Sequence, residues 1–184
     1  MCPRCRSNTE ILYEGRIEPE NNQSSIKLDG TGLEVILDNI RSTWNVGSMF
    51  RTADGVGIRH FYLCGITPTP DNSRVAKTSL GAETSIPWTY HADGVLLARS
   101  LKEKGAKLWA LEGGNNASAI EGISIQDTKH NIVLVVGNEI SGVDPGILVL
   151  CEKIWCIPMR GVKRSLNAAV AFGIAAYFLT TKPR

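Results

Sequence analysis

Five short apolar runs, separated by stretches with helical spacing, constrain the fold of this chain more than any other feature. The runs are residues 33–37, 60–64, 107–111, 132–136 and 154–157. Few polar residues interrupt them, which is typical of parallel strands covered on both faces. The stretches expected to form helices are residues 46–56, 94–104, 144–150 and 166–179. This alternation predicts an α/β fold with a mainly parallel sheet flanked by helices.

The length of 184 residues allows one compact domain. Residues 1–30 are polar, mixed in charge and without an apolar period, so we expect a poorly ordered or weakly docked leader before a folded domain at residues 31–184. The leader contains Cys2 and Cys5 at the spacing of half a zinc ribbon. Because no second pair of ligands follows, we expect no metal site.

Charge and apolar content exclude several classes of protein. The sequence has neither a run of about 18 apolar residues nor the apolar core of a signal peptide, which predicts a cytoplasmic protein without membrane contact. Its five cysteines are an odd number, so a disulfide framework is not expected. The net charge of +2 and the pI near 8.3 are low for a protein that binds nucleic acid through its bulk charge. Any nucleic-acid site must therefore be local.

The last predicted helix, residues 166–179, is apolar almost all round. A helix of this kind must be buried on more than one side. It can be sandwiched within the domain, or it can supply a subunit interface where its Ala and Gly positions allow close approach. We expect it to contribute to both.

Three segments rich in Gly, Asn, Ser and charged residues directly follow predicted strands, where open α/β sheets place their ligand sites. In the first segment, Asn45 is the predicted N-cap of a helix that begins at residue 46, and Arg51 lies nearly two turns into that helix. Asn45 can be simply a cap and Arg51 simply an exposed solubilising residue. The first segment alone does not decide between these interpretations.

The second and third segments are equally open when each is taken alone. Gly137 and Gly142 permit backbone geometry and a close approach of a ligand that side chains forbid. Glu139 between them can bind a ribose or another polar partner, or accept from backbone amides at the next helix start. In the third segment, Ser165 is the predicted N-cap of the last helix. Asn167 lies in the first turn of that helix, where an unpartnered amide costs about 1 to 3 kcal/mol. We therefore expect Asn167 to have a specific partner.

Together the three segments carry a resemblance that none carries alone. Their patterns are Asn45-x-Gly47-x-x-x-Arg51, then Gly137-Asn138-Glu139-x-x-Gly142, then Ile157-Pro158-Met159 followed by Ser165-Leu166-Asn167. In this order and spacing, the chain resembles the SpoU (TrmH-like) RNA ribose 2′-O-methyltransferases of the SPOUT superfamily over about residues 33–181. The resemblance implies a deep trefoil knot in the C-terminal part of the domain. It also implies a homodimer whose site is completed across the interface.

The resemblance further implies a cofactor and its binding loops. The cofactor is S-adenosylmethionine, held in a bent form largely by backbone groups of three loops. The residues assigned to it are Leu111, Glu112, Gly113, Gly137, Asn138, Ile157, Met159, Ser165 and Leu166.

The reaction that the resemblance implies is methyl transfer to a ribose 2′-hydroxyl of RNA, with tRNA favoured over rRNA. The residues assigned to catalysis are Arg51, Asn45, Glu139, Ser165 and Asn167. A guanidinium group cannot readily be deprotonated in a protein, which makes base catalysis by Arg51 difficult. We therefore expect Arg51 to stabilise the developing alkoxide, with the other four residues positioning it and the substrate.

Basic residues near the three segments predict an RNA-binding surface. They are Arg41, Arg51, Arg160, Lys163 and Arg164, with Arg59, Arg74 and Lys77 close by in the sequence. Such a patch neutralises phosphates without reading the base sequence. A merely solvated basic face is the alternative interpretation.

Two other functions are weighed against this one. A non-catalytic RNA-binding or assembly protein could keep the same fold, but the five candidate catalytic residues together argue against a degenerate site. A nucleotide-binding oxidoreductase is disfavoured because Gly55-Val56-Gly57 lacks the third glycine of the dinucleotide fingerprint.

Overall fold

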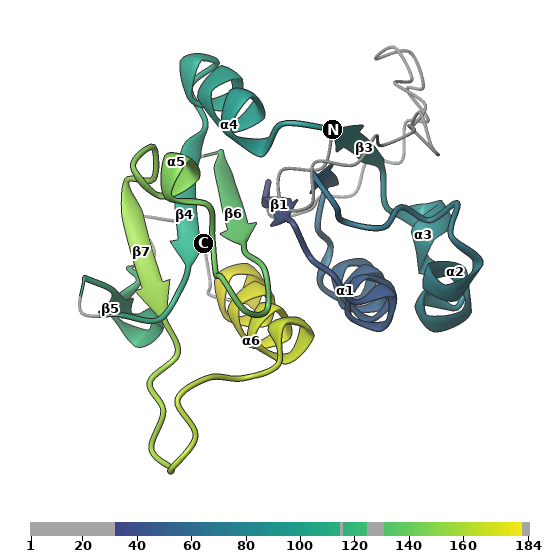
Figure 1. The fold of residues 1–184 in the computed structure, drawn as a ribbon. Coiled ribbons are helices and arrows are strands. Elements are labelled where there is room, and N and C mark those ends of the chain that lie inside the picture. Colours follow the sequence, from purple (N-terminus) through teal and green to yellow (C-terminus); the bar gives the residue numbers. More distant parts are fainter. Residues whose placement is uncertain (1–31, 115, 125–130, 182–184) are drawn as a thin grey trace, which may run out of the picture.

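A parallel sheet forms the centre of the molecule (Figure 1). The computed structural model describes residues 32–114, 116–124 and 131–181, and over these ranges the sheet has seven strands in the order β3-β2-β1-β6-β4-β7-β5. The strands are β1 (Glu34–Asp38), β2 (His60–Cys64), β3 (Trp88–His91), β4 (Lys107–Leu111), β5 (Ser118–Ala119), β6 (Ile132–Val136) and β7 (Lys153–Cys156). All neighbouring pairs are parallel, which confirms the predicted α/β class.

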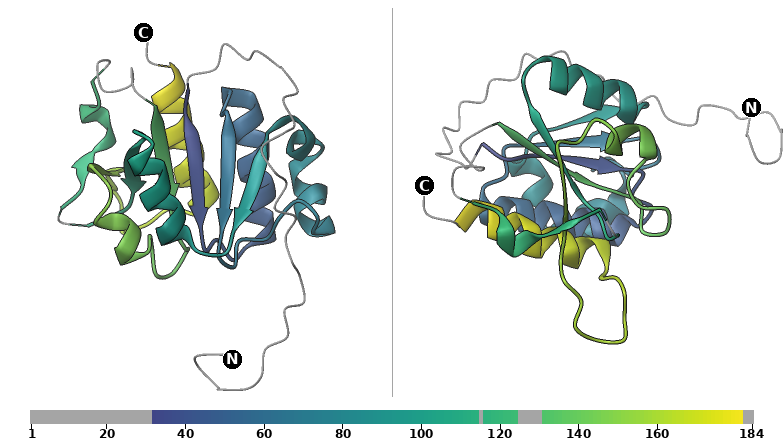
Figure 2. Two further views of the ribbon diagram at one scale, coloured as in Figure 1. Left: turned by 90° about the horizontal axis from the view of Figure 1, so that it is seen from above. Right: turned by 90° about the vertical axis from the view of Figure 1, so that its left-hand side faces the viewer.

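Helices cover the sheet in two layers, as Figure 2 shows. One layer contains α1 (Thr43–Val56), α2 (Ser73–Ser79), α3 (Ala82–Ser85) and α6 (Ala168–Thr181), whose buried side chains share a core with Leu37, Phe61 and Leu134 of the strands. The other layer contains α4 (Gly94–Glu103) and α5 (Pro145–Leu148), which pack on Ile36, Val133 and Val135. A short 3-10 helix at Ile120–Gly122 follows β5. Alternate residues of the central strands thus enter different cores, as the pleat requires.

The register of the sheet aligns the carboxyl ends of four central strands. Leu37 of β1 pairs with Val136 of β6, and Val136 pairs with Leu111 of β4. Leu111 in turn pairs with Trp155 of β7. The loops that follow these strands therefore begin along one edge of the sheet. β1 and β6 are neighbours although many elements separate them in the chain, so the first and second predicted segments start side by side.

The predicted strands are all present, three of them with the expected bounds and two displaced by one residue. The predicted helices are present as well, although α1 begins three residues earlier than expected and α6 two residues later. The prediction omitted β3, β5, α2 and α3, which are short and lie at the edges of the sheet or on the molecular surface. Short polar elements of this kind have too little apolar periodicity to be found from sequence.

The last helix is buried along one side only within this chain. Phe172, Ala175, Ala176 and Leu179 of α6 lie in the core, where α6 packs against α1. Its opposite side carries exposed apolar residues, namely Val170, Ile174 and Tyr177. The expected packing within the domain is confirmed, and burial on a second side stays a prediction. No helix among the described residues combines the length and apolarity that crossing a bilayer requires.

Candidate active site

Glu139 ties the second segment to the start of α1. Its Oε2 accepts a hydrogen bond from the backbone N–H of Arg41 at 2.9 Å, and its Oε1 accepts one from the N–H of Ser42 at 3.1 Å. The Asn45 Nδ2 group also donates to Oε1, at 2.8 Å. Of the two roles left open for Glu139, the described contacts show it accepting from amides at a helix start. The helix is α1 and not α5, the next one in sequence.

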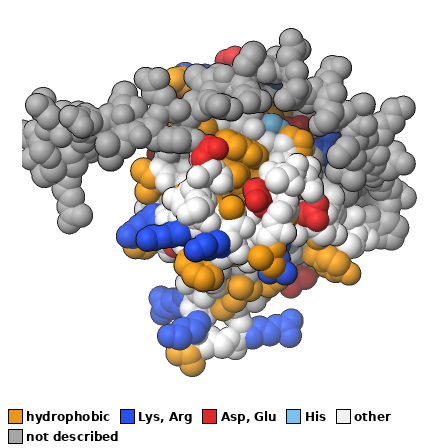
Figure 3. Space-filling view, turned by 90° about the vertical axis from the view of Figure 1, so that its right-hand side faces the viewer, with side chains coloured by type: hydrophobic (Ala, Val, Ile, Leu, Met, Phe, Trp, Pro, Cys, Tyr) orange, Lys and Arg blue, Asp and Glu red, His pale blue; other side chains and the backbone are white. Residues whose placement is uncertain are grey.

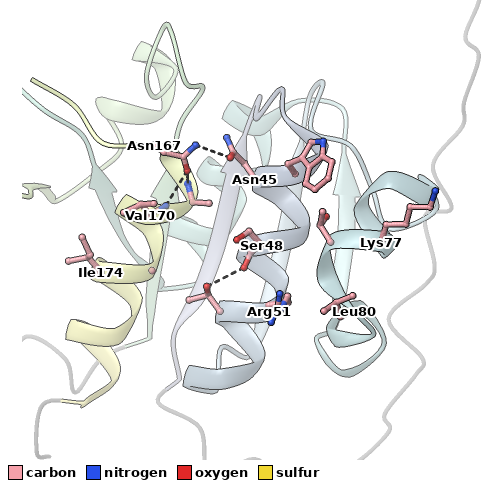
Figure 4. A pocket seen from close by; sticks show the side chains of 13 residues that line it. Asn45, Ser48, Arg51, Lys77, Leu80, Asn167, Val170 and Ile174 are labelled. Atoms are coloured by element: carbon pink, nitrogen blue, oxygen red, sulfur yellow. Dashed lines mark hydrogen bonds between the residues drawn. The ribbon is translucent and has the colours of Figure 1, made fainter. Parts of the chain in front are cut away.

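Asn45 is also hydrogen-bonded to the third segment. The Asn167 Nδ2 group donates to Asn45 Oδ1 at 3.0 Å, so both ends of the Asn45 amide are engaged (Figure 4). Asn167 Oδ1 accepts from the N–H groups of Ala169 and Val170 at 2.9 and 3.3 Å. One directional chain, Asn167 to Asn45 to Glu139, therefore joins all three segments, and Asn167 has the specific partner that its sequence position required.

Two predicted caps were wrong. Ser42 and not Asn45 is the N-cap of α1, since the Ser42 side chain accepts from Asn45 N. Asn167 and not Ser165 caps α6, which begins at Ala168. Ser, Asn and Asp side chains cap about equally well, so residue type alone does not identify the cap. Ser165 instead lies exposed in the loop between β7 and α6.

Burial and hydrogen bonding act in opposite directions on Glu139. Partial burial raises the pKa of its carboxyl group, whereas hydrogen bonds from the Arg41 and Ser42 amides and the Asn45 side chain lower it. The net effect is a pKa below the ordinary value of 4.5. Glu139 is therefore an anion that accepts three N–H groups, an arrangement suited to holding Asn45 in place and not to removing a proton at neutral pH.

Arg51 faces a groove of about 750 Å³ between α1, α2 and α6. In Figure 4, Arg51 lies farther along α1 than Asn45, on the side of Leu80, while Asn45 and Asn167 meet near the start of α6. The Arg51 side chain is exposed and is not part of the Asn167–Asn45–Glu139 chain. The groove therefore combines fixed amides at one end with an exposed cation further along.

The predicted cofactor residues after β4 and β6 are held together by Glu112. Its Oε2 accepts from Val143 N at 2.9 Å, and its Oε1 accepts from Gly113 N at 3.1 Å. Asn138 is similarly engaged, since its Oδ1 accepts from Ile140 N and its Nδ2 donates to the Asn39 carbonyl. These two side chains stabilise the loops themselves.

The residues predicted to bind cofactor after β7 lie on a loop that extends from the body of the molecule (Figure 1). Ile157 packs against the core at its beginning, whereas Met159 and Leu166 are partly exposed. The basic residues of the loop, Arg160, Lys163 and Arg164, are all exposed. Figure 3 shows the Lys and Arg side chains on the protruding lobe, with further basic side chains above it. Arg41 is also exposed, between β1 and α1.

Asp38 is a buried site residue that the sequence reasoning missed. It is 1% exposed, its Oδ2 accepts from Asp144 N at 2.9 Å, and its Oδ1 accepts from Asn39 Nδ2 at 2.8 Å. Burial raises the pKa of its carboxyl group. A carboxylate at the end of a buried strand was the available signal. Its role is to hold the loop after β6 against β1.

Potential metal ligands and thiols also occur among the described residues. No group of three or more His, Cys, Asp or Glu side chains could hold a metal ion there. Cys64, Cys151 and Cys156 are free thiols. Burial raises the pKa of Cys64 to about 12 and that of Cys151 to about 11, which leaves both unreactive at neutral pH. Cys2 and Cys5 lie outside the described residues, as does the predicted leader.

The known proteins that the chain resembles are named as RNA methylases. The sequence model of the SpoU rRNA Methylase family matches residues 32–177. The chain is 34% identical over 148 residues to YacO of Bacillus subtilis (strain 168), named as a TrmH family tRNA/rRNA methyltransferase, which covers 78% of this chain and 56% of that protein. It is 30% identical to the 23S rRNA (guanosine-2′-O-)-methyltransferase RlmB of Xanthomonas axonopodis, covering 80% and 58%. The chain thus spans a little over half the length of these relatives.

A solved structure shares the fold. The AdoMet-bound rRNA methyltransferase from Sinorhizobium meliloti superposes with a TM-score of 0.74 at 26% identity, over 80% of this chain and 55% of that one.

Proposed function

This chain belongs to the SpoU rRNA methylase family, and we propose that it transfers a methyl group from S-adenosylmethionine to a ribose 2′-hydroxyl of RNA. The observation that carries the proposal is the Asn167–Asn45–Glu139 chain, which joins three segments far apart in sequence beside the groove that Arg51 lines. The substrate RNA is tRNA or rRNA, with tRNA as the sequence-based preference. The name of the relative RlmB specifies 2′-O-methylation of 23S rRNA. For this reason rRNA is tested as a substrate alongside tRNA.

The side chains at the groove have different roles in the proposed reaction. A ribose hydroxyl is a weak nucleophile until it loses its proton, and the resulting alkoxide needs a nearby positive charge. Arg51 supplies that charge, since a guanidinium stays protonated at any working pH. Glu139 and Asn167 fix the Asn45 amide by hydrogen bonds, and a water or an RNA phosphate oxygen accepts the proton. Ser165 completes the proposed catalytic set from the loop before α6.

The loops after β4, β6 and β7 fit the proposed cofactor. A Cβ built on Gly113 meets nothing within 4 Å, so this backbone is open to close approach, and Ile157, Met159 and Leu166 offer apolar surface. Gly137 and Ser165 complete the proposed contacts, while Glu112 and Asn138 hold the loops in shape. The bound cofactor supplies the electrophilic methyl group.

The exposed side of α6 supports the proposed homodimer. Val170, Ile174 and Tyr177 leave apolar surface on a helix whose other side is already in the core. A second copy would bury this surface and complete the site. We further propose that the chain beyond β7 forms the trefoil knot typical of the family, since α6 returns from the extended loop to pack against α1 and approach β4.

The test is transfer of labelled methyl from S-adenosylmethionine to unmodified total RNA, followed by nuclease digestion and identification of the labelled nucleoside. Wild type should yield a 2′-O-methylated nucleoside, and Arg51→Ala should yield little. Arg99→Ala is the matched control, because Arg99 is an exposed arginine on α4, in the other helix layer. Label in a base would refute the ribose mechanism. RNA binding without any methyl transfer would favour the non-catalytic alternative.

A further inference from the structure

Trp44 is an exposed indole beside the proposed catalytic residues. It is 71% exposed in the first turn of α1, directly before Asn45. The other three tryptophans of the chain are less accessible, since Trp88 is half-buried and Trp109 and Trp155 are buried. Trp44 lines one groove together with three other exposed apolar side chains, Leu80, Val170 and Ile174. A grouped exposed apolar surface with polar neighbours is typical of a binding site, whereas a single exposed apolar side chain is not.

The groove that Trp44 lines is electrostatically suited to a polyanion. Its described lining includes two cations, Arg51 on α1 and Lys77 on α2, and no Asp or Glu. Thr78 Oγ1 lies 3.5 Å from the Thr43 carbonyl, so α2 and Lys77 are held close to the turn that carries Trp44. Cations beside an aromatic surface are the combination by which proteins bind single-stranded nucleic acid.

We propose that Trp44 stacks on an unpaired base of the substrate RNA, beside the ribose that Arg51 and Asn45 address. This inference rests on the proposed function and specifies the class of substrate. A base can stack on Trp44 only when it has left its own helix, as in a loop, a bulge or a flipped nucleotide. The preferred substrate is therefore RNA with a single-stranded target, and Lys77 contacts its phosphate.

The two sides of the groove separate this role from subunit contact. Val170 and Ile174 line it on α6, and Leu80 lines it on the opposite side, directly after α2 (Figure 4). The polar side chains Asn45, Ser48 and Arg51 follow Trp44 along α1. The side of the groove formed by α6 is the surface that a second copy would cover. The competing occupant of the groove is therefore a second copy of the chain, which would bury Trp44 in the dimer interface. The oligomeric state of the variants distinguishes this occupant from RNA.

The first measurement is tryptophan fluorescence. Wild type and Trp44→Phe are titrated with a short RNA hairpin and with a fully paired RNA duplex of the same composition. Because a base stacked on an indole quenches its emission, the hairpin should quench wild type and leave Trp44→Phe nearly unchanged. The duplex should quench neither. Equal quenching of both proteins by the hairpin, or strong quenching of wild type by the duplex, would overturn the proposal.

The second measurement is affinity for the labelled hairpin. Trp44→Ala and Trp44→Leu should raise the Kd about 5- to 140-fold, the range for loss of one base–aromatic stack. Trp44→Phe should lose less because it keeps an aromatic face. Leu96→Ala, which removes a 61% exposed side chain from α4 in the other layer, should bind like wild type. In methyl transfer the KM should rise while kcat is retained, because stacking holds substrate and transition state alike.

Sedimentation of each variant completes the experiment. If dissociation of the dimer accounts for the whole loss of RNA affinity in Trp44→Leu, then Trp44 belongs to the subunit interface and the proposal is wrong. If every variant binds the hairpin like wild type while methyl transfer persists, base stacking is refuted and the proposed function stands. If wild type neither binds RNA nor transfers methyl, both are refuted.

Discussion

Replacing Gly47 by alanine tests how closely α2 packs against the site-bearing helix α1. A Cβ built on Gly47 would lie 2.7 Å from the Val75 carbonyl oxygen and 2.7 Å from Thr78 Cβ, and closer still to Thr78 Oγ1. The hydroxyl can rotate away, but the Val75 carbonyl belongs to the backbone of α2 and cannot. α2 would therefore have to move outward, and Lys77 with it.

The magnitude follows from two opposing terms. Alanine is favoured over glycine in a helix interior by about 1 kcal/mol. Overpacking costs about 1 to 3 kcal/mol, and the upper part of that range applies because backbone is contacted. Gly47→Ala should therefore lower the free energy of unfolding by about 1 to 2 kcal/mol. For a chain of this size the loss corresponds to a Tm about 2 to 8 °C lower.

The assay is thermal unfolding followed by circular dichroism, with all proteins at one concentration. Gly55→Ala is the matched control, since Gly55 lies on the same helix and its added Cβ meets nothing within 4 Å. That variant should be unchanged or up to about 1 kcal/mol more stable. A Gly47→Ala protein that gains stability as Gly55→Ala does would refute the close approach of α1 and α2.

Two further predictions concern the hydrogen-bonded chain. Asn167→Ala should cost about 1 kcal/mol through loss of the α6 cap, whereas Asn167→Asp should keep the cap but lose the donor to Asn45. Both should lower methyl transfer, and full activity of Asn167→Asp would show that the link to Asn45 is dispensable. Glu139→Gln should destabilise by about 1 kcal/mol at pH 7, below the range of about 1.5 to 3 kcal/mol for a charged acceptor, because Glu139 is exposed to solvent. Because the folded pKa of Glu139 is lowered, the advantage of wild type should be complete above pH 4.5 and disappear as the pH falls further. Unfolding curves from pH 7 to pH 3 check this, and a constant difference would contradict it.

Three residues singled out from the sequence are hydrogen-bonded to one another, but the sequence did not predict these connections. Asn45, Glu139 and Asn167 were singled out because polar residues follow predicted strands. That Glu139 accepts from Asn45 across 94 residues depends on β1 and β6 being neighbours. No local pattern contains the order of strands. The exposure of Trp44 was not predicted either, since it is a property of the assembled groove.

The sequence by itself determined the parallel sheet, because short apolar runs that must be buried on both faces have few alternatives to central strands. It also determined the existence of α1 and α4, whose apolar residues recur at helical spacing, and of α6, whose apolar run is too long for a strand. Only the tertiary structure decided which of several capable residues caps each helix. Ser42 caps α1, and Asn167 caps α6 while also donating to Asn45. The physical reason is that capping preferences differ by little in free energy, so contacts made between distant segments determine the choice.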